Sequence, residues 1–283
     1  MKNLKRVWTG DCEGSYAAMA ASTIQDNICI TFDRISNGMT VAQRKLMGVK
    51  VSFQEVICNC ENCHQTHTMG CLGGSLGTTL DYLKTEGFVG GSDFSSKDPF
   101  TADGITWRQN FKWNYNNCLG FFKNYCDFKT EAGCGAPAPF NKETHCVAPT
   151  AMCKNESSKK LSDSRQKDIF TVYSPRKGQE QINQSLQNGP VVSTMELFSD
   201  VLTHPANKVY VPRSTISLGH FAVKIVGHFI DALNGNYWIV QLPLDETVGD
   251  MGIIRVRAGQ NIGDLEVNAF EVTIDKNLFA TAP

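Results

Sequence analysis

Apolar side chains recur at helical spacing in the first part of the chain. The segment 14–29 is rich in alanine, and Ala20, Ile24 and Ile28 are spaced by four residues, which predicts a helix with one apolar face. Leucines at 76, 80 and 83 predict another helix that stops at Gly87. Two further helices are predicted, one after a capping box at 52–55 and one over 179–187, which ends at an Asn-Gly-Pro stop signal.

Beyond residue 190 the pattern changes to short β-rich runs separated by turn residues. These predicted strands cover 191–198, 221–230, 237–242 and 252–257. Between the helical and β-rich parts, the stretch 90–168 is rich in Gly, Pro, Asn, aromatic residues and cysteine, which is typical of stapled loops. Helices first and strands later predict an α+β fold with segregated halves.

Composition narrows the class of protein. Hydrophobic residues make up 41% of the 283 residues, which excludes disorder over the whole chain. Lys and Arg number 27 against 28 Asp and Glu, and this balance disfavours a nucleic-acid partner. No apolar run approaches the roughly 18 residues of a membrane span. The first ten residues lack the apolar segment of a signal peptide, so we expect the sequence to be a mature or trimmed form.

All eleven cysteines lie between Cys12 and Cys153. Such clustering favours an oxidising compartment, secreted or endolysosomal, in which the cysteines form disulfides, and the odd count leaves one thiol over. The alternative is a reduced zinc protein, but no paired Cys-x-x-Cys repeats at zinc-ribbon spacing are present, so we expect neither metal nor other cofactor. The ligands of such a zinc site would come from Cys58, Cys60, Cys63, His64, His67 and Cys71.

Several ordered blocks of sequence resemble the papain family of cysteine proteases, and within it cathepsin B. One block is Gly10-Asp11-Cys12-Glu13-Gly14-Ser15-Tyr16-Ala17, and another is Cys71-Leu72-Gly73-Gly74, preceded by 52–63. The remaining blocks are 188–191, 218–223, 236–240, 249–252 and 257–260. Their order and spacing match the family over essentially the whole chain.

The resemblance implies a papain-like fold in which residues 1–283 form a single domain of two lobes. We expect a helical left lobe over about 10–88 plus the chain end, and a β-rich right lobe over about 90–265. A cysteine-rich insertion, similar to the occluding loop of cathepsin B, would cover about 103–168. Ser15 and His220 are expected to face each other across the cleft.

Catalysis in this family needs a cysteine thiolate, a histidine, an asparagine that orients the histidine, and a glutamine that helps to hold the oxyanion. The resemblance places Ser15 at the nucleophile position and Thr9 at the glutamine position. Leu242 stands at the asparagine position, and His220 alone retains the family residue. Read without the resemblance, Ser15 is a helix cap and His220 a histidine on the cleft wall with no catalytic duty.

These replacements predict an inactive pseudoprotease rather than an efficient peptidase. A serine hydroxyl is neutral at pH 7 and needs a well-aimed base, and Leu242 cannot accept a hydrogen bond from an imidazole ring. A peptide or protein ligand in the cleft, or a structural or storage role, would fit such a protein. The alternative is a weak serine-dependent hydrolase that uses Ser15 and His220.

The resemblance also implies a disulfide framework that uses ten cysteines and leaves over Cys29, which we predict to be a free, buried thiol. The implied pairs are Cys12–Cys71, Cys60–Cys63, Cys58–Cys146, Cys118–Cys153 and Cys126–Cys134.

Further positions bear on specificity. Gly73 and Gly74 would let a peptide backbone lie in the cleft, or would simply form a tight turn beside a disulfide. Asn268 maps to the acidic floor of the S2 pocket, and the insertion lacks the adjacent histidine pair that binds a substrate carboxylate in cathepsin B. Asn155 and Asn183 match the N-glycosylation pattern.

Overall fold

The computed structural model describes residues 14–35, 51, 53–64, 73–89, 165–166, 170–233, 235–244 and 247–275. The chain divides into two compact units. The strand-rich unit comprises residues 1–10, 18–39 and 169–283, and the helical unit comprises 11–17 and 40–168. The lobe limits given above and the insertion at 103–168, which lies almost entirely outside the described residues, stay predictions.

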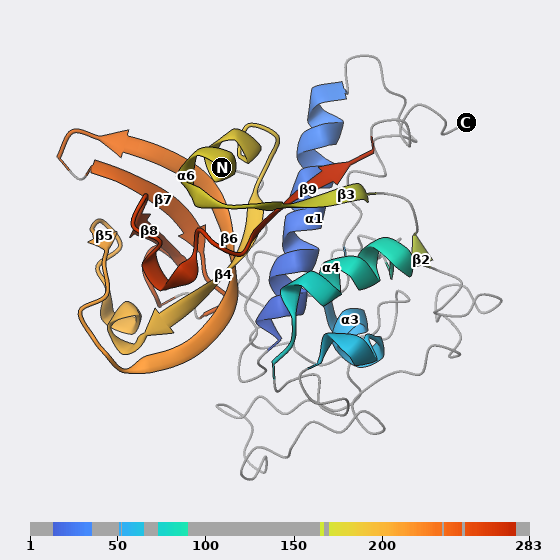
Figure 1. Ribbon diagram of the computed structural model, residues 1–283, viewed down its shortest axis with the longest axis horizontal. Helices are drawn as coiled ribbons and strands as arrows, with labels where there is room; N and C mark the ends of the chain where they lie inside the picture. The colour runs from blue at the N-terminus through green and yellow to red at the C-terminus, as the bar shows by residue number, and fades with distance from the viewer. Residues whose placement is uncertain are drawn as a thin grey trace, which may run out of the picture. The chain divides into compact units, whose positions relative to one another are not determined.

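A seven-stranded sheet forms the frame of the strand-rich unit (Figure 1). Its strands are antiparallel except for the parallel pair β5 and β8. In spatial order they are β3 (Phe170–Arg176), β9 (Ala269–Ile274), β4 (Val191–Phe198), β6 (Ser217–Asp231), β7 (Gly235–Gln241), β8 (Ile253–Arg257) and β5 (Val209–Tyr210). Helix α6 (Gly178–Ser185) and the short 3-10 helices η5 (Ser199–Thr203) and η6 (Ile262–Asp264) connect them.

One face of the central strands forms the apolar core of this unit. Because side chains alternate along a strand, every second residue of β4 and β6 points into this core. The buried core residues include Val191, Met195 and Leu197 of β4, Val223 and Ile225 of β6, and Trp238 and Val240 of β7.

The opposite face of β6 carries a buried charge. Lys224 has no exposed surface, and its Nζ donates hydrogen bonds to Ser22 Oγ at 2.7 Å and Asp26 Oδ2 at 2.5 Å. Both partners lie on α1 (Ser15–Ile35), whose residues from 18 onward belong to the strand-rich unit. Burial lowers the pKa of Lys224, and the nearby Asp26 carboxylate opposes that shift. The ion pair therefore ties helix α1 to the centre of the sheet.

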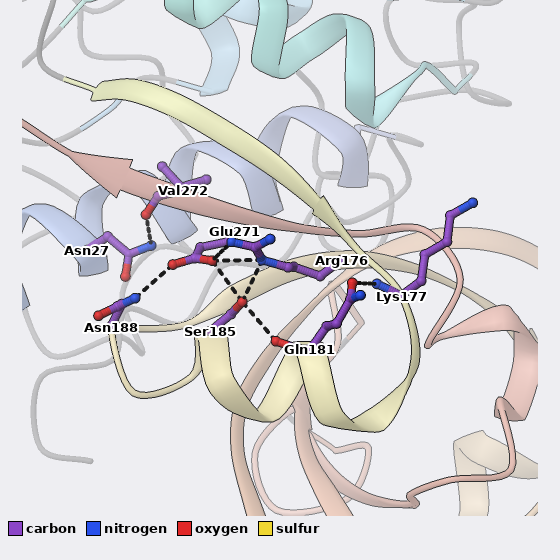
Figure 2. Close-up of polar contacts among 8 residues, drawn as sticks. All are labelled: Asn27, Arg176, Lys177, Gln181, Ser185, Asn188, Glu271 and Val272. Carbon is purple, nitrogen blue, oxygen red and sulfur yellow. Dashed lines mark hydrogen bonds and ion pairs between the residues drawn. The ribbon is translucent and has the colours of Figure 1, made fainter.

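A second polar network centres on Glu271 of β9 (Figure 2). Its carboxylate accepts hydrogen bonds from Arg176 of β3, Ser185 of α6 and Asn188. Burial alone would raise the pKa of Glu271, but these three donors and the Arg176 charge outweigh burial and hold the pKa below its ordinary value. The network thus joins an edge strand and a helix to β9.

The helical unit contains α3 (Phe53–Asn59), the 3-10 helix η2 (Glu61–Cys63), α4 (Leu76–Thr85) and a two-stranded sheet of β1 (Phe88–Val89) and β2 (Arg165–Gln166). Ser75 caps α4, and its side chain accepts a hydrogen bond from the Thr78 amide. Leu76, Leu80 and Leu83 of α4 are buried. The leucine pattern therefore predicted this helix and its inner face correctly.

The predicted elements are confirmed, with changes at their ends. Helix α1 runs beyond 29 to Ile35, and the four predicted strands correspond to β4, β6, β7 and β8. Strands β3 and β9 were missed, as were the two-residue strands β1, β2 and β5 (Val209–Tyr210). Pro175 weakens the strand signal of β3, and β3 tolerates it because this strand forms an edge of the sheet. No helix among the described residues is long and apolar enough to cross a membrane.

Removing one member of the buried ion pair should cost much more stability than removing both. We expect Asp26→Leu to destabilise the protein by about 3–5 kcal/mol, because it leaves the Lys224 charge buried without the Asp26 carboxylate. The double variant Asp26→Leu with Lys224→Met should recover most of this loss. Urea unfolding of the three proteins measures the difference, and equal destabilisation by the single and double changes would contradict the assignment.

The Glu271 network should appear in the pH dependence of stability. Because the folded pKa of Glu271 lies below its ordinary 4.5, its contribution is present above that pH and is lost as the pH falls through the folded pKa. We expect Glu271→Gln to flatten the decline of the urea midpoint between about pH 6 and pH 3. A decline as steep as that of the wild type would show that Glu271 does not contribute in this way.

Candidate functional site

Ser15, at the predicted nucleophile position, is the first residue of α1 and is buried. The next residue, Tyr16, is also buried, and its ring meets the ring of His64 edge to face, with centroids 6.3 Å apart. Burial raises the pKa of the Tyr16 hydroxyl, so it is a neutral phenol at physiological pH. Both rings belong to the helical unit.

Gly74, the second residue of the predicted glycine pair, lies beside His64 and Tyr16. Gly74 forms an antiparallel bridge with His64, and Gly73 has a positive φ of 89°. A Cβ on Gly74 would lie 2.5 Å from the carbonyl oxygen of Cys63 and 2.8 Å from the Tyr16 ring. Position 74 therefore needs glycine for the close approach of two chain segments, and both the tight-turn and the peptide-binding interpretations of the pair stay predictions.

His220 lies on β6 with its side chain exposed. Its direct partner across the β4–β6 ladder is Glu196. The register is regular from Gly219 to Ile225, so His220 shares the face of β6 that carries Lys224, and Phe221 shares the face that carries Val223.

Leu242 is fully buried in the apolar core of the strand-rich unit. It follows β7, and its backbone amide donates to the carbonyl of Gly252 at 2.8 Å. Phe221 and Leu244 are partly buried and pack against the same core. Position 242 thus presents a hydrocarbon side chain to hydrocarbon neighbours.

The remaining site positions are spread over the chain. Asn268 is exposed in the bend before β9, and Asn183, one of the two glycosylation candidates, is exposed on α6. Thr9 and Asn155 lie outside the described residues. Ser15 belongs to the helical unit and His220 to the strand-rich unit, so their expected meeting stays a prediction.

The cysteines agree with the predicted framework where the structure describes them. The Cys60–Cys63 disulfide is confirmed. It occupies two sulfur atoms that the alternative zinc site would need as thiolates. Cys29 carries a thiol on α1 and is half-buried rather than fully buried. Each of the other four predicted pairs includes a cysteine outside the described residues.

Comparison with known proteins identifies the family. The model for the papain family of cysteine proteases matches residues 5–273, so the chain belongs to this family. It is cathepsin B-like: it is 26% identical over 271 residues to cathepsin B-like cysteine proteinase 5 of Caenorhabditis elegans. That match covers 92% of this chain and 66% of the relative, so the chain spans about two thirds of the relative's length.

Solved structures confirm the papain-like α+β fold. Procathepsin B S9 from Trypanosoma congolense superposes with a TM-score of 0.61 at 19% identity, covering 96% of this chain and 72% of that chain. Bromelain from Ananas comosus, solved in complex with the E64 inhibitor, gives a TM-score of 0.55 at 14% identity, covering 97% and 95%. At these identities the likeness establishes the fold alone.

The close approach at Gly74 gives a testable consequence. Gly74→Ala should destabilise the protein by about 1–3 kcal/mol, because its Cβ meets a backbone carbonyl that cannot rotate away. Gly227→Ala on β6 is the matched control, since the nearest atom to its added Cβ is a Phe229 ring carbon at 3.4 Å. Thermal unfolding compares the stability of the two variants. Equal losses of stability would show that the close approach at Gly74 does not require glycine at this position.

Proposed function

We propose that this cathepsin B-like chain is a pseudoprotease that does not cleave peptides efficiently. The observation that carries the proposal is the complete burial of Leu242 among apolar side chains. By resemblance this position belongs to the asparagine that accepts a hydrogen bond from the catalytic histidine. A leucine there offers no acceptor, so the tautomer and orientation of an imidazole are left unfixed.

The residues at the nucleophile and oxyanion positions also argue against efficient proteolysis. Ser15 carries a hydroxyl that must lose its proton to a well-aimed base, whereas a cysteine beside a histidine is readily a thiolate. Thr9 is too short to take over the reach of a glutamine, and losing one oxyanion donor costs about 10²–10³ in rate. Catalytic groups act as a unit, so these losses do not simply multiply, but together they make proteolysis inefficient.

A papain-family fold that lacks the catalytic groups fits a binding, structural or storage role. We expect this role in an oxidising environment, with the protein either secreted or endolysosomal. A peptide or protein segment is the expected ligand, because the resemblance places Gly73 and Gly74 where the family holds a peptide backbone. Asn268 in place of an acidic residue, and an insertion without a histidine pair, indicate that specificity has changed along with the catalytic residues.

Turnover of fluorogenic dipeptide and longer peptide substrates tests the proposal. We expect no turnover above background for the wild type, no change in Ser15→Ala, and little gain in Ser15→Cys, because the new thiol lacks an oriented base. An active cathepsin B assayed in parallel shows that the substrates are suitable. Wild-type turnover that disappears in Ser15→Ala would instead establish the alternative, a serine-dependent hydrolase.

A further inference from the structure

We infer that Phe221, and not His220, occupies the position from which the histidine of this family acts, so that the general base is lost as well. The inference rests on the proposed function in one respect: it takes Leu242 to stand at the orienting asparagine position. Everything else in the argument comes from the register and burial of strands within the strand-rich unit.

The β6–β7 ladder places Phe221 on the same face as Leu242. Lys224 pairs with Gln241 and Ile225 with Val240. Continuing this antiparallel register sets Val223 opposite Leu242, and Phe221 opposite Leu244. Burial agrees with the register, because Val223 and Leu242 are core residues while Phe221 and Leu244 pack against that core.

His220 lies on the other face. His220 and Lys224 are an even number of residues apart on β6, so their side chains lie on the same face of the sheet. The side chain of Lys224 reaches Asp26 on α1, and the cross-strand partner of His220 is Glu196. The backbone of β6 therefore separates the His220 ring from the Leu242 side chain. An acceptor at position 242 could not reach that ring without a change in register.

An orienting asparagine works by accepting a hydrogen bond from the imidazole, so both must lie on one face of the sheet. Val223 and Ile225 share this face but are fully buried in the core, so the partly buried Phe221, one diagonal step from Leu242, is the residue that meets this requirement. A phenyl ring can neither take up nor release a proton. Phe221 and Leu244 thus pack against the same apolar core as Leu242, where the resemblance would place a polar histidine–asparagine pair.

Thiol reactivity at position 15 tests the inference. The background is Ser15→Cys with Thr9→Gln and Leu242→Asn, to which Phe221→His or His220→Gln is added. The rate of alkylation by iodoacetamide is followed against pH at the peptide containing residue 15, so that Cys29 does not interfere. In the background alone we expect an ordinary thiol, with alkylation rising at about pH 8.5.

Adding Phe221→His should shift alkylation to lower pH, because an imidazole on the correct face forms an ion pair with the thiolate. Peptide turnover should rise by about 10²-fold or more over the background. Adding His220→Gln should change neither quantity. Low-pH alkylation in the background that His220→Gln abolishes would overturn the inference and make His220 the base.

Core substitutions at 221 and 242 can prevent folding, so a second comparison leaves the core intact. Ser15→Cys with and without His220→Gln should give the same alkylation profile, and a low-pH component that depends on His220 would refute the inference. The wild type with His220→Gln separates the two claims. Wild-type turnover insensitive to this change would refute the proposed function alone, whereas turnover that it abolishes would refute both.

Discussion

Lys224 is a charged side chain with no exposed surface, and its hydrogen bonds to Asp26 and Ser22 attach helix α1 to β6. A buried ammonium is tolerated only beside such a partner, so this contact fixes which face of β6 is turned toward α1. The alternate residues then have to enter the apolar core, as Val223 and Ile225 do. A slip of one residue would exchange these two sets, which makes the register of β6 strongly specified.

The register of β6 decides which side chains lie on each face of the strand at the candidate site. The side chain of His220 lies on the face of β6 that carries Lys224, and the side chain of Phe221 lies on the face that carries the core residues. The asparagine that the resemblance expects at position 242 is replaced by Leu242, which joins the same apolar packing as Leu244. Replacing several interacting polar groups together avoids leaving a buried donor or acceptor without its partner, which would cost about 1–3 kcal/mol. On the proposed function, the fold is thereby kept while the catalytic chemistry is removed.

Sequence reasoning predicted the helices and the central strands because their patterns are local. The leucines of α4 and the β-rich run of β4 each bury one face, and each pattern is visible in a few residues. The edge strand β3 was missed because Pro175 interrupts its signal. His220 was selected for its residue type, but the face on which it lies depends on pairing with β4 and β7, which residue type does not reveal. The Cys60–Cys63 disulfide came from the family resemblance, since spacing alone could not give the connectivity.

The central claim is that Ser15 is not an activated nucleophile. Labelling with a fluorophosphonate followed by intact-mass measurement tests it directly, because this reagent modifies a serine only where a base has activated the hydroxyl. An active serine hydrolase serves as the positive control and Ser15→Ala as the matched variant. The account predicts no adduct on the folded wild type. A stoichiometric adduct on the folded protein that maps to Ser15, and that is absent in Ser15→Ala, would contradict it.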